Sequence, residues 1–254
     1  MIESYAISHV GCVRRHNEDR VLADESLGLF IVADGMGGHK HGEVAADLAI
    51  STVRQYIEKS REPAEVTWPF GYCFDLSLEA NRLSTGMRLA NRRVWRLAEQ
   101  APEYIGMGTT IAAVLLVDDR AVIGNVGDSR VYLFRGGELT QLTTDDTWIA
   151  SFLGTDLLAP DAARNHPMRN VLTQAAGSQE TIDVHIREQS LLKGDTFLIS
   201  SDGLHGIVED QTMGYALATE SGLSRMAAAL LREAQQKNAP DNVSVVLLRY
   251  DRQI

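Results

Sequence analysis

The sequence predicts an α+β fold in which largely antiparallel β-sheets are covered by helices. Short β-rich segments follow one another through turn residues, and Gly136-Gly137 is a favoured two-residue loop between two of them. Three longer segments instead predict helices, and in two of them apolar residues recur at three- and four-residue spacing, the pattern of helices that bury one face. Because such helices pack on the faces of sheets, the two patterns together predict a layered architecture.

The first half of the chain supplies a buried strand and two helices. Residues 28–33 form a continuous apolar run of strand length. Within residues 42–59, apolar side chains such as Ala45 and Ala49 recur on one helical face. Residues 76–99, which are rich in Arg, Leu and Ala, predict the second helix.

The second half of the chain predicts mainly strands. A last helix is expected over residues 222–237, where Leu223, Met226 and Leu230 recur at helical spacing. Residues 144–180 mix polar and apolar side chains and contain two prolines, so we expect an irregular stretch, and long ordered loops are often functional. The predicted strands span residues 109–117, 121–126, 130–135, 138–142, 183–189, 195–200 and 243–250.

Composition excludes several classes of partner. The chain has 254 residues, 44% of them hydrophobic, with a formal net charge of −10 and a pI of about 5.2. This length allows one large domain or two small ones. An acidic chain is a poor partner for nucleic acid, and the Lys/Arg clusters expected of a membrane-surface protein are missing. We therefore expect neither nucleic acid nor a membrane as partner.

Cysteine usage and the N-terminal segment predict a cytoplasmic protein. Cys12 and Cys73 form no C-x-x-C pair and fit no zinc spacing, so we expect two reduced thiols. The N-terminus lacks the basic and apolar regions of a signal peptide, and no apolar stretch approaches the length of a membrane span.

Acidic residues stand near the ends of several predicted strands, in short segments that contain Gly or Asn. Each of them alone has a simpler interpretation as a turn or as solvated surface charge. Their repetition favours convergence, because strands that end in carboxylates can gather these side chains at one pole of a sheet. Carboxylates without thiolates suit hard cations such as Mg²⁺ or Mn²⁺, which implies metal-assisted chemistry on a phosphate or a water. The residues are Glu18, Asp19, Asp34, Asp128, Asp202 and Asp241.

Neighbouring motifs leave two interpretations open. The glycine run at residues 35–38 lacks the spacing of nucleotide-binding loops, so we expect it to bring the backbone close to metal ions. His39 and His41 could ligate zinc, but an H-x-H pair without a third ligand is usually a surface or supporting feature. Arg14 and Arg15 either grip a phosphate at the edge of a metal site or are ordinary solvated charges.

The sequence indicates neither a catalytic carboxylate dyad nor a covalent nucleophile. Asp118-Asp119 resembles a catalytic carboxylate dyad, but the strands predicted on both sides favour a turn. The sequence contains neither a G-x-S-x-G elbow nor a Cys-x₅-Arg phosphate loop, so a covalent nucleophile is not expected. A metal-activated water is the economical alternative.

A series of longer motifs runs along nearly the whole chain: G-C-V-R-R-H-N-E-D (11–19), V-A-D-G-M-G-G-H (32–39), G-E-V-A-A (42–46), M-G-T-T (107–110), G-N-V-G-D-S-R-V-Y (124–132), L-T-T-D (142–145), N-V-L-T-Q-A-A-G (170–177), G-D-T-F-L-I-S-S-D-G-L (194–204) and D-N-V-S-V-V (241–246). In these motifs and their order, the chain resembles the metal-dependent serine/threonine protein phosphatases of the 2C type, in their compact bacterial form.

The resemblance implies a four-layer α-β-β-α sandwich of two largely antiparallel sheets flanked by helices. A single catalytic domain would span residues 1–254, with a flap at about 145–170 beside the active site. At one end of the sheets, two Mn²⁺ or Mg²⁺ ions would activate a water for attack on phosphoserine or phosphothreonine, and bacterial members add a third, weaker ion.

Roles for the site residues follow from the matching motifs. Asp34 would bridge the two ions, Gly35 would offer its carbonyl oxygen, and Asp202 and Asp241 would complete the first metal site. Arg14 matches the arginine that grips the substrate phosphate.

The acidic pair Glu18 and Asp19 would serve the second ion, and which of the two touches it stays open. Asp128 would help to hold the third.

The chain departs from the family pattern at two positions. Met36 stands where animal relatives have a histidine proposed as the general acid, so His39 or a water at the metals would supply the proton. Asp146 stands where the flap entry, L-T-x-D-H, usually has a histidine.

The resemblance also implies partners. These are phosphorylated proteins, an opposing Hanks-type serine/threonine kinase with its substrates and, as in some relatives, type VI secretion components, with this chain acting as a monomer. The alternative, a non-catalytic scaffold of the same fold, would have lost metal ligands, and none is lost here. The sequence does not name the substrate or decide between Mn²⁺ and Mg²⁺.

Overall fold

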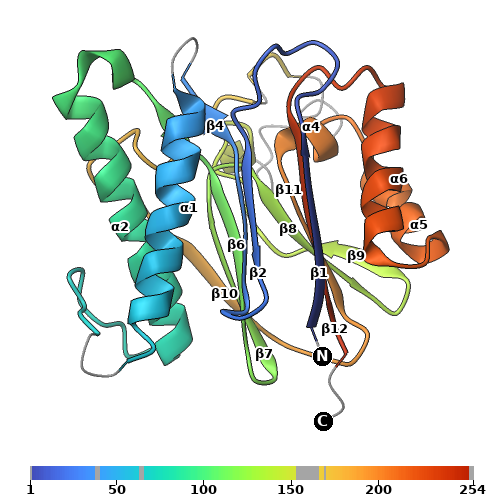
Figure 1. The fold of residues 1–254 in the computed structure, drawn as a ribbon, viewed down its shortest axis with the longest axis horizontal. Coiled ribbons are helices and arrows are strands. Elements are labelled where there is room, and N and C mark those ends of the chain that lie inside the picture. The colour runs from blue at the N-terminus through green and yellow to red at the C-terminus, as the bar shows by residue number, and fades with distance from the viewer. Residues whose placement is uncertain (1, 38–40, 63–65, 153–165, 169, 252–254) are drawn as a thin grey trace.

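The computed structural model describes residues 2–37, 41–62, 66–152, 166–168 and 170–251. Two five-stranded sheets lie face to face, and helices cover their outer faces (Figure 1). Paired neighbours in both sheets run antiparallel. The predicted α-β-β-α sandwich of two antiparallel sheets is therefore confirmed.

The first sheet has the strand order β10-β7-β6-β3-β2. Helices α1 (Gly42–Lys59) and α2 (Leu78–Gln100) pack on it and share one apolar core with it. Ser77 caps α2, since its side chain accepts a hydrogen bond from the Ala80 amide at 3.1 Å. The strands are β2 (Arg20–Asp24), β3 (Leu29–Ala33), β6 (Ile111–Val117), β7 (Arg120–Val126) and β10 (His185–Ser190).

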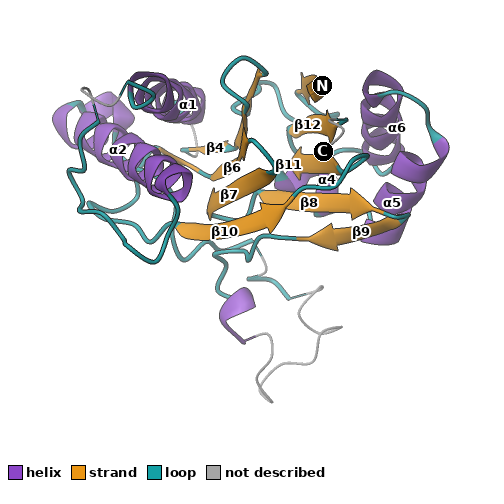
Figure 2. Cartoon of the chain, turned by 90° about the horizontal axis from the view of Figure 1, so that it is seen from below, coloured by secondary structure: helices purple, strands orange, loops and turns teal. Residues whose placement is uncertain are grey.

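The second sheet has the order β1-β12-β11-β8-β9. Helices α5 (Asp210–Thr219) and α6 (Leu223–Gln236) cover its outer face, and the short helix α4 (Asp202–His205) lies at its end (Figure 2). The strands are β1 (Ile2–His9), β8 (Arg130–Arg135), β9 (Glu138–Gln141), β11 (Thr196–Ser200) and β12 (Val243–Tyr250).

A third apolar core lies between the two sheets. Phe30 and Val32 of β3 meet Ile199 of β11 and Val246 of β12 there, all of them buried. Strand β3 is therefore buried on both faces, which explains why its sequence is a continuous apolar run rather than an alternating one. Burial of each large aliphatic side chain contributes about 1.5–3 kcal/mol, so this layer fixes the strand ends that carry the site.

Most predicted elements lie where the sequence places them, and strands β8 and β12 match their predicted bounds. Helix α1 begins and ends where the sequence predicts, and α2 begins two residues later than expected. Strands β1 and β2, which are only partly buried, were not predicted, and neither was α5, whose apolar pattern is weak. The two-residue strands β4 (Gly35–Met36) and β5 (Gly108–Thr109), which pair with each other, were not predicted either.

The predicted flap lies partly outside the described residues. In the described part, an isolated bridge joins Thr147 to Leu172, and a short 3₁₀ helix, η2 (Ala150–Phe152), extends away from the sandwich (Figure 2). A second 3₁₀ helix, η1 (Pro102–Tyr104), follows α2. Among the helices that the structure describes, none is both long and apolar enough to cross a membrane.

Candidate active site

Strand β4 and helix α4 lie at the same end of the sandwich (Figure 1). A cavity of about 460 Å³ opens there, lined by residues of both elements. Segments far apart in the sequence meet around it, because antiparallel strands from both sheets end or begin there. The convergence predicted from the sequence is therefore observed for most of the acidic residues. The cavity is lined by Arg14, Arg15, His16, Glu18, Asp34, Gly35, Met36, Gly37, Thr110, Asp128, Asn170, Leu172, Asp202, Asp241 and Asn242.

Asp34 is placed by the end of the buried strand β3. Its amide donates to Thr110 Oγ1 at 3.0 Å, and its carbonyl oxygen accepts from the Thr110 amide at 2.9 Å. Gly35 then begins β4, and a Cβ there would lie 2.2 Å from the Gly42 carbonyl oxygen and 2.6 Å from that of Glu18. Only glycine fits this close approach of three backbone segments, which explains the Asp-Gly pair after the strand.

Asp34 is also the centre of negative charge in the cavity. Burial, followed by the charges of Asp19, Asp202, Asp128 and Asp241, raises the pKa of its carboxyl group well above the ordinary value. Like charges this close to one another favour the neutral form in the absence of a counter-ion. The four carboxylates that raise this pKa, those of Asp19, Asp128, Asp202 and Asp241, are among the residues that the sequence grouped with Asp34.

Two of these neighbours carry raised pKa values of their own. Burial, then the charges of Asp202 and Asp145, raises the pKa of Asp128 to about 8. Burial, then the charges of Asp241 and Asp19, raises the pKa of Asp202 to about 6. Clustered groups with strongly shifted pKa values in a cavity are typical of functional sites.

Glu18 and Asp19 occupy different positions. Glu18 lines the cavity, and burial followed by the charge of Glu43 raises its pKa. Asp19 is only 2% exposed and lies behind the cavity wall, where its Oδ2 accepts from Ser201 Oγ at 2.7 Å. Its Oδ1 is buried and accepts no hydrogen bond from any residue that the structure describes. A buried carboxylate oxygen without a partner is costly unless a cation offsets its charge.

The donor set fits divalent metal ions. All proposed ligands offer oxygen, the carboxylates lie in one another's field, and Asp19 Oδ1 is buried without a partner among the described residues. As oriented in the described part of the chain, no three His, Cys, Asp or Glu side chains form a closed set around a single point.

Arg14 is the residue that engages Asp241. Its Nη2 donates to Asp241 Oδ2 at 2.6 Å, and this hydrogen bond raises the pKa of the guanidinium. The Arg14 side chain is 56% exposed at the cavity rim, so it can reach a ligand that enters from solvent. Arg15 also lines the cavity.

Two supporting residues were missed in the sequence. Asn242 Nδ2 donates to the carbonyl oxygens of Val10 and His16 at 2.9 and 3.0 Å, and its Oδ1 accepts from the Glu18 amide at 2.8 Å. Ser201 joins Asp19 to β12 in a similar way. The only signal was their position beside Asp241 and Asp202 in P-D-N-V and S-S-D-G.

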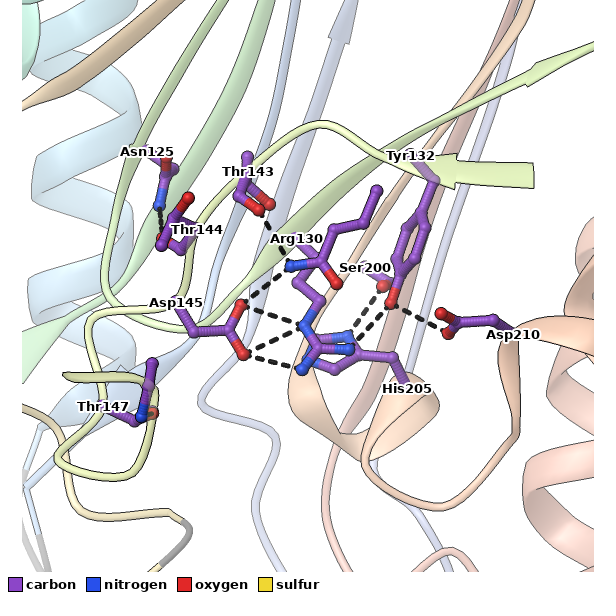
Figure 3. A network of polar contacts seen from close by, with 12 residues as sticks. Asn125, Arg130, Tyr132, Thr143, Thr144, Asp145, Thr147, Ser200, His205 and Asp210 are labelled. Atoms are coloured by element: carbon purple, nitrogen blue, oxygen red, sulfur yellow. Dashed lines mark hydrogen bonds and ion pairs between the residues drawn. The ribbon is translucent and has the colours of Figure 1, made fainter. Parts of the chain in front are cut away.

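A part-buried polar network follows Asp128 along the chain (Figure 3). The guanidinium of Arg130 donates to both carboxylate oxygens of Asp145, with Nη2 at 2.7 Å from Oδ2, and to Tyr132 Oη at 3.0 Å. Beside it, His205 Nδ1 lies 2.9 Å from Ser200 Oγ, and burial lowers the pKa of this imidazole well below its usual value. The network joins β8, β11 and α4 to the chain that enters the flap.

Three other features were predicted from the sequence: His39, His41 and the Asp118-Asp119 pair. His39 lies outside the described residues. The ring of His41 packs edge-on against Tyr104, with centroids 4.8 Å apart. Asp118 and Asp119 form the turn between β6 and β7, as predicted.

Comparison with known proteins gives the family. The chain matches the family described as Protein phosphatase 2C over residues 13–247. It is 35% identical over 242 residues to the serine/threonine protein phosphatase PstP of Mycobacterium tuberculosis. That match covers 95% of this chain and 44% of the relative, so the chain spans less than half of the length of PstP.

Two solved structures are similar over nearly all of the chain. The catalytic domain of PstP in complex with two manganese ions is 32% identical, with a TM-score of 0.83 and 99% of both chains covered. PppA, described as a key regulatory component of the type VI secretion system in Pseudomonas aeruginosa, is 31% identical, with a TM-score of 0.80 and 98% of this chain and 97% of that chain covered. The chain belongs to the protein phosphatase 2C family.

Proposed function

We propose that this chain is a metal-dependent phosphatase that removes phosphate from phosphoserine and phosphothreonine in proteins. The observation that carries the proposal is the convergence of Asp34, Asp128, Asp202 and Asp241 on one cavity with Arg14 at its rim. This arrangement combines oxygen ligands for hard cations with a guanidinium suited to a phosphate. Family membership and the phosphatases among the relatives support it.

Mn²⁺ or Mg²⁺ is the cofactor that the donor set favours. Asp34, the Gly35 carbonyl oxygen, Asp202 and Asp241 would hold one ion. Bound in this cavity, such ions would lower the pKa of a water and offset the charge of the phosphate. The two manganese ions in the PstP structure support a binuclear site, and the choice between the metals is open to measurement.

Glu18 and Asp19 would serve a second ion. Glu18 faces the cavity, whereas Asp19 lies behind it with one oxygen that has no partner in the described part of the chain, so Asp19 is suited to act at the inner side of the site. Asp128 would help to hold a third ion.

The side chains around the metals bind and orient the substrate. Arg14 would exchange its contact with Asp241 for the phosphate oxygens, where its planar guanidinium can donate two parallel hydrogen bonds. This exchange would free Asp241 to act as a ligand. His39, next to the cavity-lining segment in sequence, would donate a proton to the departing serine or threonine oxygen.

Metal dependence is tested with p-nitrophenyl phosphate after exhaustive dialysis against EDTA. We expect no hydrolysis in metal-free buffer and recovery on addition of Mn²⁺ or Mg²⁺, with Ca²⁺ and Zn²⁺ as comparison ions. Hydrolysis that persists without metal would contradict the proposal. A folded protein that is inactive with every ion would favour the non-catalytic scaffold.

The role of His39 is tested by comparing two leaving groups. A nitrophenolate needs no proton to leave, whereas a serine alkoxide does. We expect His39→Ala to slow hydrolysis of a phosphothreonine peptide far more than that of p-nitrophenyl phosphate. Equal effects on both substrates would exclude His39 as the acid.

We further propose a cellular setting. The substrates would be proteins phosphorylated by a serine/threonine kinase, and the likeness to PppA makes type VI secretion components one candidate group. The chain would act as a single catalytic domain and as a monomer. Cys12 and Cys73 are both exposed and unpaired, which agrees with the reducing cytoplasm as its location.

A further inference from the structure

Asp146 carries a carboxylate that the proposed metal site does not use. It lies at the beginning of the flap, next to Asp145 of the part-buried network, and its side chain is only 10% exposed, with both carboxylate oxygens in hydrogen bonds. We propose that Asp146 is a positioning residue that holds the Gly127 peptide and thereby the carboxylate of Asp128 in the cavity. The inference rests on the proposed function only because Asp128 would matter for catalysis as a metal ligand.

The contact between Asp146 and Gly127 is reciprocal. The Asp146 amide donates to the Gly127 carbonyl oxygen at 3.0 Å, and the Gly127 amide donates to Asp146 Oδ2 at 2.9 Å. Gly127 has φ +93°, and a Cβ on it would lie 2.7 Å from Thr110 Cγ2. The peptide that leads into Asp128 is therefore hydrogen-bonded by Asp146 and lies close to the Thr110 side chain.

Two further donors hold the Asp146 carboxylate itself. His185 Nε2 lies 2.8 Å from Oδ1, and Gln174 Nε2 donates to Oδ2 at 2.9 Å. His185 is the first residue of β10 and pairs in register with Asn125 of β7, the strand that runs into Gly127. The side chain of Gln174 is fixed in turn, because its amide group exchanges two hydrogen bonds with the backbone of Asp183.

The carboxylate therefore joins three segments at one point. These are the β7–β8 loop with Gly127, the chain at Gln174 and the start of β10. Hydrogen bonds to an ionised acceptor are stronger than neutral ones, and only a carboxylate offers two oxygens that both accept. An amide at position 146 offers one accepting oxygen in place of two and removes the negative charge, so Asp146→Asn should weaken the hydrogen bond from the Gly127 amide without removing bulk.

The first experiment measures hydrogen exchange of the Gly127 amide in metal-free protein. Asp146→Asn should raise its exchange rate by about tenfold or more, as expected for loss of a charge-assisted hydrogen bond. The matched control is Arg120→Gln, which removes the 3.4 Å ion pair with Glu188 between the other ends of the same two strands. Unchanged exchange at Gly127 in folded Asp146→Asn protein would overturn the proposal.

The second experiment separates positioning from stability. Substitution of a residue that orients a metal ligand typically lowers the affinity for the metal by about 10–100-fold. Asp146→Asn should therefore need about tenfold more Mn²⁺ for half-maximal hydrolysis of p-nitrophenyl phosphate, while kcat at saturating Mn²⁺ stays close to that of the unmodified protein. His185→Ala should also raise the Mn²⁺ concentration needed for half-maximal hydrolysis. His185→Gln, which keeps a hydrogen-bond donor, should return this concentration to that of the unmodified protein.

The possible results distinguish failure of the proposed phosphatase function from failure of the positioning role of Asp146. If the unmodified protein shows no metal-stimulated hydrolysis, the proposed function fails, while the exchange rate at Gly127 still decides whether Asp146 positions the loop. If Asp146→Asn lowers the melting temperature but leaves the Mn²⁺ requirement unchanged, its role is structural and the positioning claim is wrong.

Discussion

Arg14 and Asp241 form an ion pair at the mouth of the acidic cavity, with Arg14 Nη2 2.6 Å from Asp241 Oδ2. The two side chains are 56% and 37% exposed, so solvent screens them and their contact adds little to stability. An exposed pair of this kind can be opened easily by a phosphate that competes for the guanidinium or a cation that competes for the carboxylate.

Arg14→Ala tests this role. Because a charge-assisted hydrogen bond contributes about 1.5–3 kcal/mol, KM for a phosphopeptide should rise about tenfold or more, and inhibition by inorganic phosphate should weaken equally. Affinity for Mn²⁺, measured by calorimetry, should not fall, since Asp241 is freed rather than removed. Arg15→Ala is the control on the same rim, and loss of metal binding in Arg14→Ala would show that the assigned role is wrong.

At the scale of elements, the site depends on loops that single side chains fasten to strands. Asn242, at the start of β12, holds the loop of residues 10–18 through three hydrogen bonds, and this loop carries Arg14 and Glu18. The sequence predicted β12 and the acidic pair but not this connection, because backbone contacts of an asparagine leave no periodic pattern.

Asn242→Ala should therefore affect both stability and catalysis. Loss of three hydrogen bonds at a residue that is 6% exposed should lower the free energy of unfolding by about 2–4 kcal/mol, measured by urea denaturation. The matched control is Asn81→Ala in α2, which also loses bonds to several backbone groups, those of Cys73, Leu76 and Ser77.

Both variants should be destabilised, and only Asn242→Ala should lose kcat/KM under conditions where each is folded. Equal catalytic losses would mean that the Asn242 loop contact has no specific role.

Elements also differ in how far the sequence could predict them. Helix α1 and the hairpin at Gly136-Gly137 were predicted well, because periodicity and turn chemistry are local signals. Strand β1 was not predicted, since it lies at a sheet edge with partly exposed faces and its partner β12 is more than two hundred residues away. Its pairing is a property of the whole chain.

At the scale of the whole molecule, the sandwich gathers negative charge at one end and holds it there by packing. This arrangement predicts an unusual dependence of stability on pH in metal-free protein. The pKa of Asp128 is about 8 in the folded state, against about 3.9 for an unfolded aspartate. Between these values the folded state binds the proton that the unfolded state releases, so the contribution of Asp128 to stability increases as the pH falls.

Asp128→Asn should remove this contribution. In EDTA, the variant should be more stable than the unmodified protein at pH 8, and the difference should shrink by up to about 1.4 kcal/mol per unit as the pH is lowered toward 4. Urea denaturation at several pH values measures it. A difference that grows on acidification would contradict the direction given for this pKa.

For the whole site, the sequence predicted which residues take part better than it predicted how they are arranged in space. Strand-end motifs identified Asp34, Asp128, Asp202 and Asp241, and all four line one cavity. The sequence could not separate Glu18, which faces the cavity, from Asp19, which is buried behind it, because adjacent residues on an irregular loop have no fixed relative direction. The contacts of Asp146 were likewise invisible, since His185 and Gln174 reach it from distant segments.

The most direct test of the central claim is Asp34→Asn. The substitution keeps the shape of the side chain and removes the charge at the centre of the carboxylate cluster. Hydrolysis of a phosphothreonine peptide in saturating Mn²⁺, measured with a circular-dichroism check of the fold, should show a kcat lowered by at least about 10²-fold. A folded Asp34→Asn protein that turns over at a near-normal rate would contradict the assignment of this cavity as a metal-dependent phosphatase site.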